Sequence, residues 1–184
     1  TCLARYIHCI RSGGVAVFPA DTVYGLACDP ENADAVDRLY ALKGRPPAKP
    51  AAVMFFDAAA LPPLPEQARA LLPGPVTVLV PNPERRFPLA CGPTPDVLGV
   101  RMIEGPLAGA QVAVLQSSAN HAGGADARTV AEIPAGILAG ADLVIDAGPL
   151  PGTPSTVIDF TSEKYRILRE GALTAAEIAR MLQE

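Results

Sequence analysis

Apolar residues along this chain gather in short runs, separated by segments rich in proline, glycine and polar residues. Short runs between turn-forming residues are typical of buried β-strands. The pattern predicts strands over residues 14–18, 51–56, 76–80, 98–102, 112–115, 143–145, 156–160 and 165–168. Residues 19–26, which mix proline, aspartate and glycine, are predicted to be an ordered loop, and the proline-rich residues 81–95 a second loop.

Helical spacing of apolar residues appears between some of these strands. Asn32 is placed to cap a helix that carries Lys43 on its apolar face, and Gly44 is placed to end it. A short helix is predicted over residues 66–72. A last helix begins at Thr174, which forms a capping box with Glu177.

The order of these elements predicts one α/β domain over residues 1–184, with a twisted, mostly mixed sheet and flanking helices. The chain is long enough to bury a substantial core. No apolar run has the length of a membrane span and the first residues lack a signal-peptide pattern, so we expect a soluble, cytoplasmic protein. A net charge of −4 and a pI of about 5.2 argue against broad contact with a nucleic-acid backbone.

Several common kinds of site are absent from the sequence. The four cysteines and two histidines are too scattered for a zinc site or a disulfide framework. Neither histidine accompanies a G-x-S-x-G motif, so a Ser-His-Asp hydrolase is disfavoured. Both the P-loop and the G-x-G-x-x-G phosphate-binding motifs are missing. Any nucleotide must therefore be held mainly by side chains.

Residues 43–50 (KGRPPAKP) form the most unusual segment, because they hold two of the three lysines of the chain around Arg45. Three prolines stiffen this loop, and it begins at the end of a predicted helix, where the helix dipole favours positive charge. The segment is therefore predicted to be an anion-binding loop. Taken alone, Lys43 and Arg45 are more often a solvated helix end than a site.

Other polar residues lie at similar ends of predicted strands and helices, where side chains can converge on one cavity. The candidates are Lys43, Arg45, Lys49, Arg101 and Arg169, together with Thr22, Ser118, Asn120 and Ser155. Arg101 lies in an otherwise apolar strand, so its guanidinium needs a partner or a wet cavity. Guanidinium groups suit bidentate contacts with phosphate or carboxylate, whereas lysines act as compact charges toward a polyphosphate.

In order and spacing these residues resemble the YrdC/TsaC-type threonylcarbamoyl-AMP synthases, in their short single-domain form. The matching segments are 19–26 (PADTVYGL), 43–45 (KGR), 73–77 (PGPVT), 99–101 (GVR), 118–120 (SAN), 155–157 (STV) and 167–171 (ILREG). Each motif is weak alone, but K-x-R followed by S-x-N and then S-T-V is a specific signature. The resemblance implies a large concave cavity on one face of the sheet.

The resemblance also implies a reaction. Threonine captures bicarbonate or CO2 as a carbamate, which attacks the α-phosphate of ATP to give threonylcarbamoyl-AMP and pyrophosphate. ATP would be a substrate, with Mg2+ arriving on its phosphates rather than on protein side chains. A separate transferase complex would pass the product to tRNA as threonylcarbamoyladenosine, so direct tRNA binding is expected to be weak or absent.

By the same resemblance, site residues receive roles. Those expected to contact ATP are Arg45, Lys49, Asn120, Thr129 and Arg169. Those expected to bind threonine are Thr22, Arg101, Ser118 and Ser155. Because joining two anions requires charge stabilisation more than a strong base, Lys43 and Arg45 are the candidate catalytic residues, with Lys43 beside the phosphates or the carbamate.

Two alternatives stay open from the sequence. Clustered cations and the link to tRNA suggest an RNA-binding module, which would show affinity that falls steeply with salt. Departures from the family pattern suggest a paralogue with another carbamoyl or acyl substrate: Ala20 replaces a frequent threonine, Met54 a histidine found in some relatives, and Val97 a frequently polar residue.

Overall fold

The computed structural model describes residues 1–183, within which nine strands form one mixed sheet. The strands are β1 (Ala16–Pro19), β2 (Tyr24–Cys28), β3 (Ala52–Phe55), β4 (Val76–Pro81), β5 (Val97–Met102), β6 (Val114–Ser118), β7 (Leu143–Val144), β8 (Thr156–Asp159) and β9 (Arg166–Arg169). Their spatial order is β7-β1-β2-β6-β3-β5-β4-β8-β9. Three neighbouring pairs are parallel, namely β1 with β7, β3 with β5 and β4 with β8.

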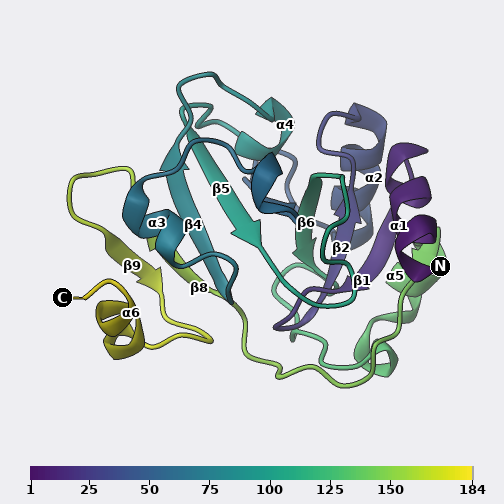
Figure 1. The fold of residues 1–184 in the computed structure, drawn as a ribbon. Coiled ribbons are helices and arrows are strands. Elements are labelled where there is room, and N and C mark those ends of the chain that lie inside the picture. The colour runs from purple at the N-terminus through teal and green to yellow at the C-terminus, as the bar shows by residue number, and fades with distance from the viewer. Residues whose placement is uncertain (184) are drawn as a thin grey trace.

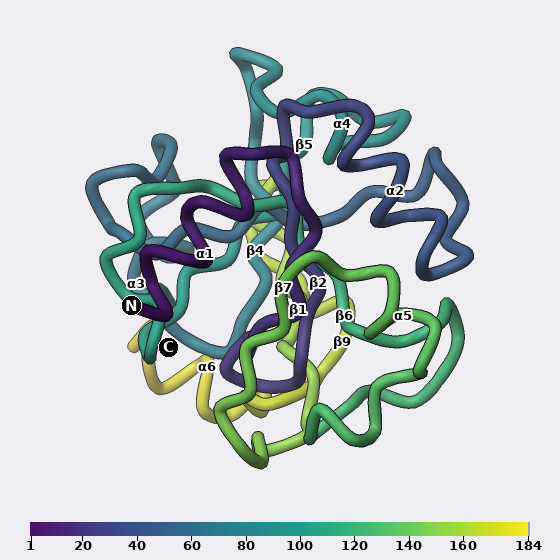
Figure 2. Tube along the Cα trace, turned by 90° about the vertical axis from the view of Figure 1, so that its right-hand side faces the viewer, coloured from purple at the N-terminus to yellow at the C-terminus, as the bar shows by residue number. Residues whose placement is uncertain are grey.

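Helices flank this sheet (Figure 1). They are α1 (Cys2–Arg11), α2 (Ala33–Lys43), α3 (Glu66–Ala70), α4 (Pro88–Cys91), α5 (Ala135–Gly140) and α6 (Ala175–Met181), with single 3-10 turns η1 (Ala58–Ala60) and η2 (Val130–Glu132). In the side view of Figure 2, α1 and α2 lie on opposite sides of β1 and β2. No helix in the described part of the chain is long and apolar enough to cross a membrane.

Successive side chains along a strand point to opposite faces of the sheet, and the two faces differ in what covers them. In β4, Val76, Val78 and Val80 are buried in the main core, which includes apolar residues of α2, α5 and α6. A second, smaller core lies on the opposite face, where Tyr6 of α1 packs against Phe18 with ring centroids 5.7 Å apart. Thr77 of β4 faces away from the main core and lines a cavity. One face of the sheet thus carries both α1 and an open site.

The predicted fold class is confirmed, and each predicted strand is present with small shifts at its ends. The predicted caps are also confirmed: the Asn32 side chain accepts from the N–H of Ala35 at 3.0 Å, and the Thr174 side chain from that of Glu177 at 3.2 Å. Gly44 ends α2 in the left-handed conformation. Helix α3, predicted over residues 66–72, ends earlier, at Ala70.

Four elements differ from the predictions. Residues 19–26 are not all loop, because β2 begins at Tyr24. Every residue of this strand is buried, so its sequence lacks the alternation of apolar and polar residues that predicts a half-buried strand. The loop predicted over residues 81–95 contains one helical turn, α4. Helices α1 and α5 were not predicted; α5 is short and has glycine at two of its six positions, which weakens a helical pattern.

Candidate functional site

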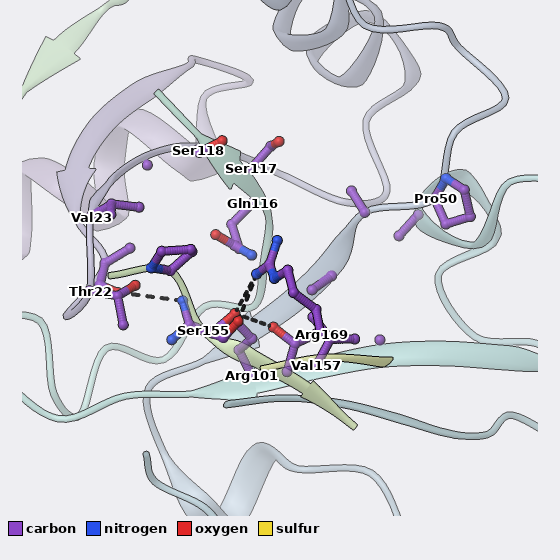
Figure 3. A pocket seen from close by; sticks show the side chains of 18 of the residues that line it. Thr22, Val23, Pro50, Arg101, Gln116, Ser117, Ser118, Ser155, Val157 and Arg169 are labelled. Atoms are coloured by element: carbon purple, nitrogen blue, oxygen red, sulfur yellow. Dashed lines mark hydrogen bonds between the residues drawn. The ribbon is translucent and has the colours of Figure 1, made fainter. Parts of the chain in front are cut away.

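A cavity of about 340 Å³ opens on the face of the sheet that α1 only partly covers. This volume is at the lower end of the range for small-molecule sites, ~300–1,000 Å³. Its floor comes from the central strands, and its walls from the loops before β2, after α2 and before β8 (Figure 3). Six of the residues predicted for the site line it, namely Thr22, Arg45, Arg101, Ser118, Ser155 and Arg169.

The other predicted residues lie outside this lining. Lys49 is exposed, and its backbone oxygen accepts from the Tyr40 hydroxyl at 2.7 Å. Thr129 is half-buried at the start of η2, where its side chain makes no capping bond. Lys43 and Asn120 are buried behind the wall formed by Ser118.

Lys43 joins the K-x-R and S-x-N motifs. Its side chain is 2% exposed, and its ammonium donates to the backbone oxygen of Ser118 and to both oxygens of Asn120, at 3.0 Å for the backbone and 2.8 Å for the side chain. Burial, followed by the nearby Arg45 cation, lowers the pKa of Lys43 from 10.5 to about 8. All three ammonium hydrogens therefore have acceptors in the protein.

Asn120 is the centre of this network. Its side-chain oxygen accepts from Lys43 and, at 2.8 Å, from the Ser118 hydroxyl. Its amide nitrogen donates to the backbone oxygen of Gly124 at 2.9 Å and to the Asp126 carboxylate at 3.1 Å. Every hydrogen-bonding position of the Asn120 amide is thus used within the protein. The arrangement fixes the Ser118 hydroxyl at the edge of the cavity.

Arg45 reaches the cavity from the loop that follows α2. Its guanidinium carbon lies 5.6 Å from the centroid of the Tyr40 ring, and one terminal nitrogen donates to the backbone oxygen of Pro50. Its Nε is buried and has no hydrogen-bond partner among the residues that the structure describes. The Arg45 cation is thus held in place on its loop but is incompletely satisfied by the protein.

Arg101 is 3% exposed and rises from β5 at the other end of the cavity. Its guanidinium donates to the backbone oxygens of Val76 and Ala20, at 3.3 and 3.4 Å, and to the Asp21 carboxylate at 2.8 Å. Asp21 has a φ of 62°, a left-handed conformation that aspartate tolerates better than most residues. The prediction that Arg101 needs a partner is therefore confirmed, and the partner is Asp21, which lies in a left-handed turn.

Ser155 and Arg169 form a third polar corner. The terminal nitrogen of Arg169 donates to the backbone oxygen of Ser155 at 2.7 Å, and the Ser155 hydroxyl is 2.8 Å from that of Thr77 (Figure 3). Arg169 belongs to β9 and Ser155 precedes β8, so the pairing of these strands brings the two residues together. Despite this bond, Arg169 remains exposed at the rim of the cavity.

Sequence reasoning assigned no role to several polar lining residues, including Thr77, Gln116 and Asp126. Thr77 was detectable, because it is the polar position in the alternating strand 76–80. Gln116 was less so, because the strand was predicted to end at Leu115 whereas β6 continues to Ser118.

The three departures from the family pattern lie at or near this site. Ala20 and Val97 line the cavity. Met54 is fully buried in the second core and pairs in register with Arg101 on the neighbouring strand.

The sequence matches the Sua5/YciO/YrdC family, described as telomere recombination, over residues 8–171. The chain belongs to this family. The resemblance inferred from the motifs is therefore confirmed. A threonylcarbamoyl-AMP synthase of Halorhodospira halophila is 39% identical over 137 residues, covering 67% of this chain and 71% of that protein. The synthase of Chromohalobacter salexigens is 35% identical over 175 residues, covering 87% and 93%.

Solved structures agree with this placement in the Sua5/YciO/YrdC family. Pyrococcus abyssi Sua5, solved in complex with L-threonine, superposes with a TM-score of 0.88 at 28% identity. The match covers 98% of this chain but 57% of the Sua5 chain, so this protein spans little more than half the length of that relative. Escherichia coli YciO, at 24% identity and a TM-score of 0.80, shares the fold over 96% of this chain and 92% of its own.

Proposed function

We propose that this protein is an L-threonylcarbamoyl-AMP synthase. The observation that carries the proposal is a single cavity with Arg101 at one end and the linked K-x-R and S-x-N motifs at the other. Two curated relatives carry that name, and the match to the Chromohalobacter salexigens protein covers 93% of that relative. The cavity thus offers a carboxylate site and a phosphate site within reach of one substrate pair.

The reaction has two bond-forming stages. The threonine amine adds to CO2 to give a carbamate and a proton, or it condenses with bicarbonate to give the same carbamate and a molecule of water. One carbamate oxygen then bonds to the α-phosphorus of ATP, while the bond from that phosphorus to the β-phosphate oxygen breaks and pyrophosphate leaves with the electron pair. Two anions must approach each other, so held cations contribute more than acid-base groups.

Arg101 is the proposed partner of the threonine carboxylate. A guanidinium has five N–H donors, of which three are engaged by Val76, Ala20 and Asp21. The remaining two are available for a bidentate contact with a carboxylate. Thr22, Ser118 and Ser155 line the same cavity and are the proposed hydroxyl contacts of the amino acid.

The proposed ATP contacts are Arg45 and Arg169 in the wall, with Lys49 reaching in from the exposed loop and Thr129 from beside η2. Arg45 is the stronger catalytic candidate, because it lines the cavity whereas Lys43 is buried behind Ser118. Lys43 and Asn120 act through Ser118, whose position their hydrogen bonds fix. This modifies the expectation that Lys43 itself stands beside the phosphates or the carbamate.

Magnesium is proposed to arrive as the MgATP substrate. Asp126 is the acidic side chain among the lining residues, and it already accepts from Asn120. No group of three potential metal ligands occurs among residues 1–183. The donor set therefore suits a metal held by ATP phosphates rather than a protein cage.

The product is a reactive mixed anhydride, so a transferase acting on tRNA is the proposed consumer. Because the net charge is −4, direct binding of RNA by this protein is proposed to be weak or absent. We also propose that the protein acts in the cytoplasm.

Pyrophosphate release from ATP tests the function. Release should require both threonine and bicarbonate and should be much slower with serine, which lacks the γ-methyl group. Folded protein that releases no pyrophosphate under these conditions would refute the synthase proposal. Release with another amino acid in place of threonine would indicate a paralogue with a different substrate.

A further inference from the structure

Gln116 is a polar side chain on the cavity floor, and it has no hydrogen-bond partner in the part of the chain that the structure describes. It is half-buried and lines the cavity, and its amide makes no hydrogen bond within residues 1–183. Its neighbours differ, because Arg101 and Ser118 are each bonded to another side chain. An amide carries two N–H donors and an acceptor oxygen. All of these are free for a ligand.

Small residues on the flanking strands leave space around Gln116. It pairs in register with Ala27 of β2 on one side and with Ala52 of β3 on the other. Next to Ala52 is Gly99 of β5, where an added Cβ would lie 3.4 Å from the Cα of Ala52. The floor is therefore a shallow trough. The Gln116 side chain rises from it near the middle of the site (Figure 3).

Gln116 also lies between the two ends of the cavity. Toward one end, Val114 lies two residues before Gln116 and pairs with Met54 of β3. Met54 in turn pairs with Arg101 of β5, so Arg101 lies two strands away on the same face of the sheet. Toward the other end, Ser118 is two residues away on the same face, about 7 Å along the strand. Arg45 binds the backbone oxygen of Pro50, two residues before the Ala52 that faces Gln116. A threonine held at Arg101 and phosphates held at Arg45 would meet above Gln116.

We propose that Gln116 is a further catalytic residue, whose amide donates a hydrogen bond to the carbamate where it meets the α-phosphate. This inference rests on the proposed synthase function. A carbamate has two oxygens, and a donor bound to one of them directs the other toward phosphorus. A neutral amide does this without changing protonation, and it keeps its geometry while charge moves from the carbamate to pyrophosphate.

Two variants of matched size test the proposal. Gln116→Met removes the donors, and we expect kcat for pyrophosphate release to fall about 100-fold, the order found when one donor to a reacting oxygen is lost. Gln116→Glu places a negative charge against the carbamate, so kcat should fall further. The KM values for threonine and ATP should change much less, because Arg101 and Arg45 still hold the two substrates.

Gln111→Met and Gln111→Glu are the controls. Gln111 is exposed, and it contacts Arg11 through its backbone oxygen, so both substitutions should leave turnover unchanged. Melting temperatures should match the wild type for all four variants, since neither side-chain amide is bonded within the described chain.

The outcomes separate this inference from the proposed function. Wild-type protein that makes no pyrophosphate refutes the function. Active wild type with a fully active Gln116→Met variant overturns the role of Gln116 alone. An active Gln116→Glu variant beside an inactive Gln116→Met variant also overturns it, because a residue that accepts from the adenine amino group would behave in that way.

Discussion

Lys43 is a titratable group buried behind Ser118, and it is electrostatically coupled to Arg45, the proposed phosphate contact. Its pKa of about 8 reflects burial and the Arg45 cation, so near pH 8 the ammonium is partly deprotonated. ATP bound next to Arg45 would add negative charge and raise this pKa. Binding at pH 8 should therefore take up protons, whereas binding at pH 6 should not, because Lys43 is already charged.

Calorimetric titration in two buffers of different ionisation enthalpy measures this uptake. Wild-type protein should give different apparent binding enthalpies in the two buffers at pH 8 and equal ones at pH 6. In Lys43→Met the difference at pH 8 should disappear. Equal wild-type enthalpies at pH 8, in titrations that do show binding, would mean that Lys43 is not electrically coupled to ATP.

At the scale of single residues, the sequence was a better guide to which side chains line the cavity than to their hydrogen-bond partners. Arg101 was recognisable as a charge in an apolar strand. Its partner Asp21 was not, because the contact depends on a left-handed turn. The burial of Lys43 was partly visible, since it shares the apolar face of its helix. Its bonds to Ser118 and Asn120 span more than seventy positions of sequence, a distance at which periodicity gives no information.

At the scale of elements, the cationic loop after α2 rests against α4. Gly92, which follows α4, has a φ of 58°, and a Cβ added there would collide with the backbone oxygen of Ala48 in the loop. The N–H of Ala51 donates to the backbone oxygen of Ala90 at 2.9 Å. These contacts hold the loop that carries Arg45 at the edge of the cavity. They were not predicted, because α4 lies in a segment whose prolines indicated a loop.

Gly92→Ala should therefore lower the free energy of unfolding by about 3 kcal/mol, combining backbone strain with a steric clash. Gly123→Ala is the matched control: its φ is also positive, at 81°, but an added Cβ would have no described atom within 4 Å apart from its own chain neighbours. The control should lose only about 1 kcal/mol from strain. Urea denaturation measures both changes. Equal losses in the two variants would show that the contact between Gly92 and Ala48 adds nothing.

At the scale of the whole molecule, the four thiols report how the chain is packed. Cys2 is exposed, whereas Cys9, Cys28 and Cys91 are buried. Burial raises the pKa of each buried thiol, that of Cys28 from 9.0 to about 12. A reagent that attacks thiolates should therefore label one cysteine rapidly in native protein at pH 8, and three more only after unfolding. Rapid labelling of a second thiol in folded protein would contradict this packing.

Buried titratable groups also make the free energy of unfolding depend on pH in alkaline solution. The folded chain keeps the Cys28 proton at pH values where the unfolded chain releases it. This contribution to the free energy of unfolding is complete below pH 9 and is lost as the pH rises toward 12. Lys43 acts in the opposite direction, because its pKa in the folded protein, about 8, lies below its ordinary value of 10.5. Through Lys43, the free energy of unfolding therefore rises as the pH increases from 8 to 10.5.

Through its ion pair with Asp21, the guanidinium of Arg101 has a counter-ion supplied by the protein itself. A carboxylate that bound Arg101 would have to share the guanidinium with Asp21 or displace it. A small anion that made only this contact would gain little binding free energy, because it would replace an existing contact between Arg101 and Asp21. A larger molecule, whose other groups contacted Ser118, Ser155 or Gln116 as proposed, would gain further binding free energy. The ion pair would therefore favour a molecule that presents several matching groups over a small anion that offers only one.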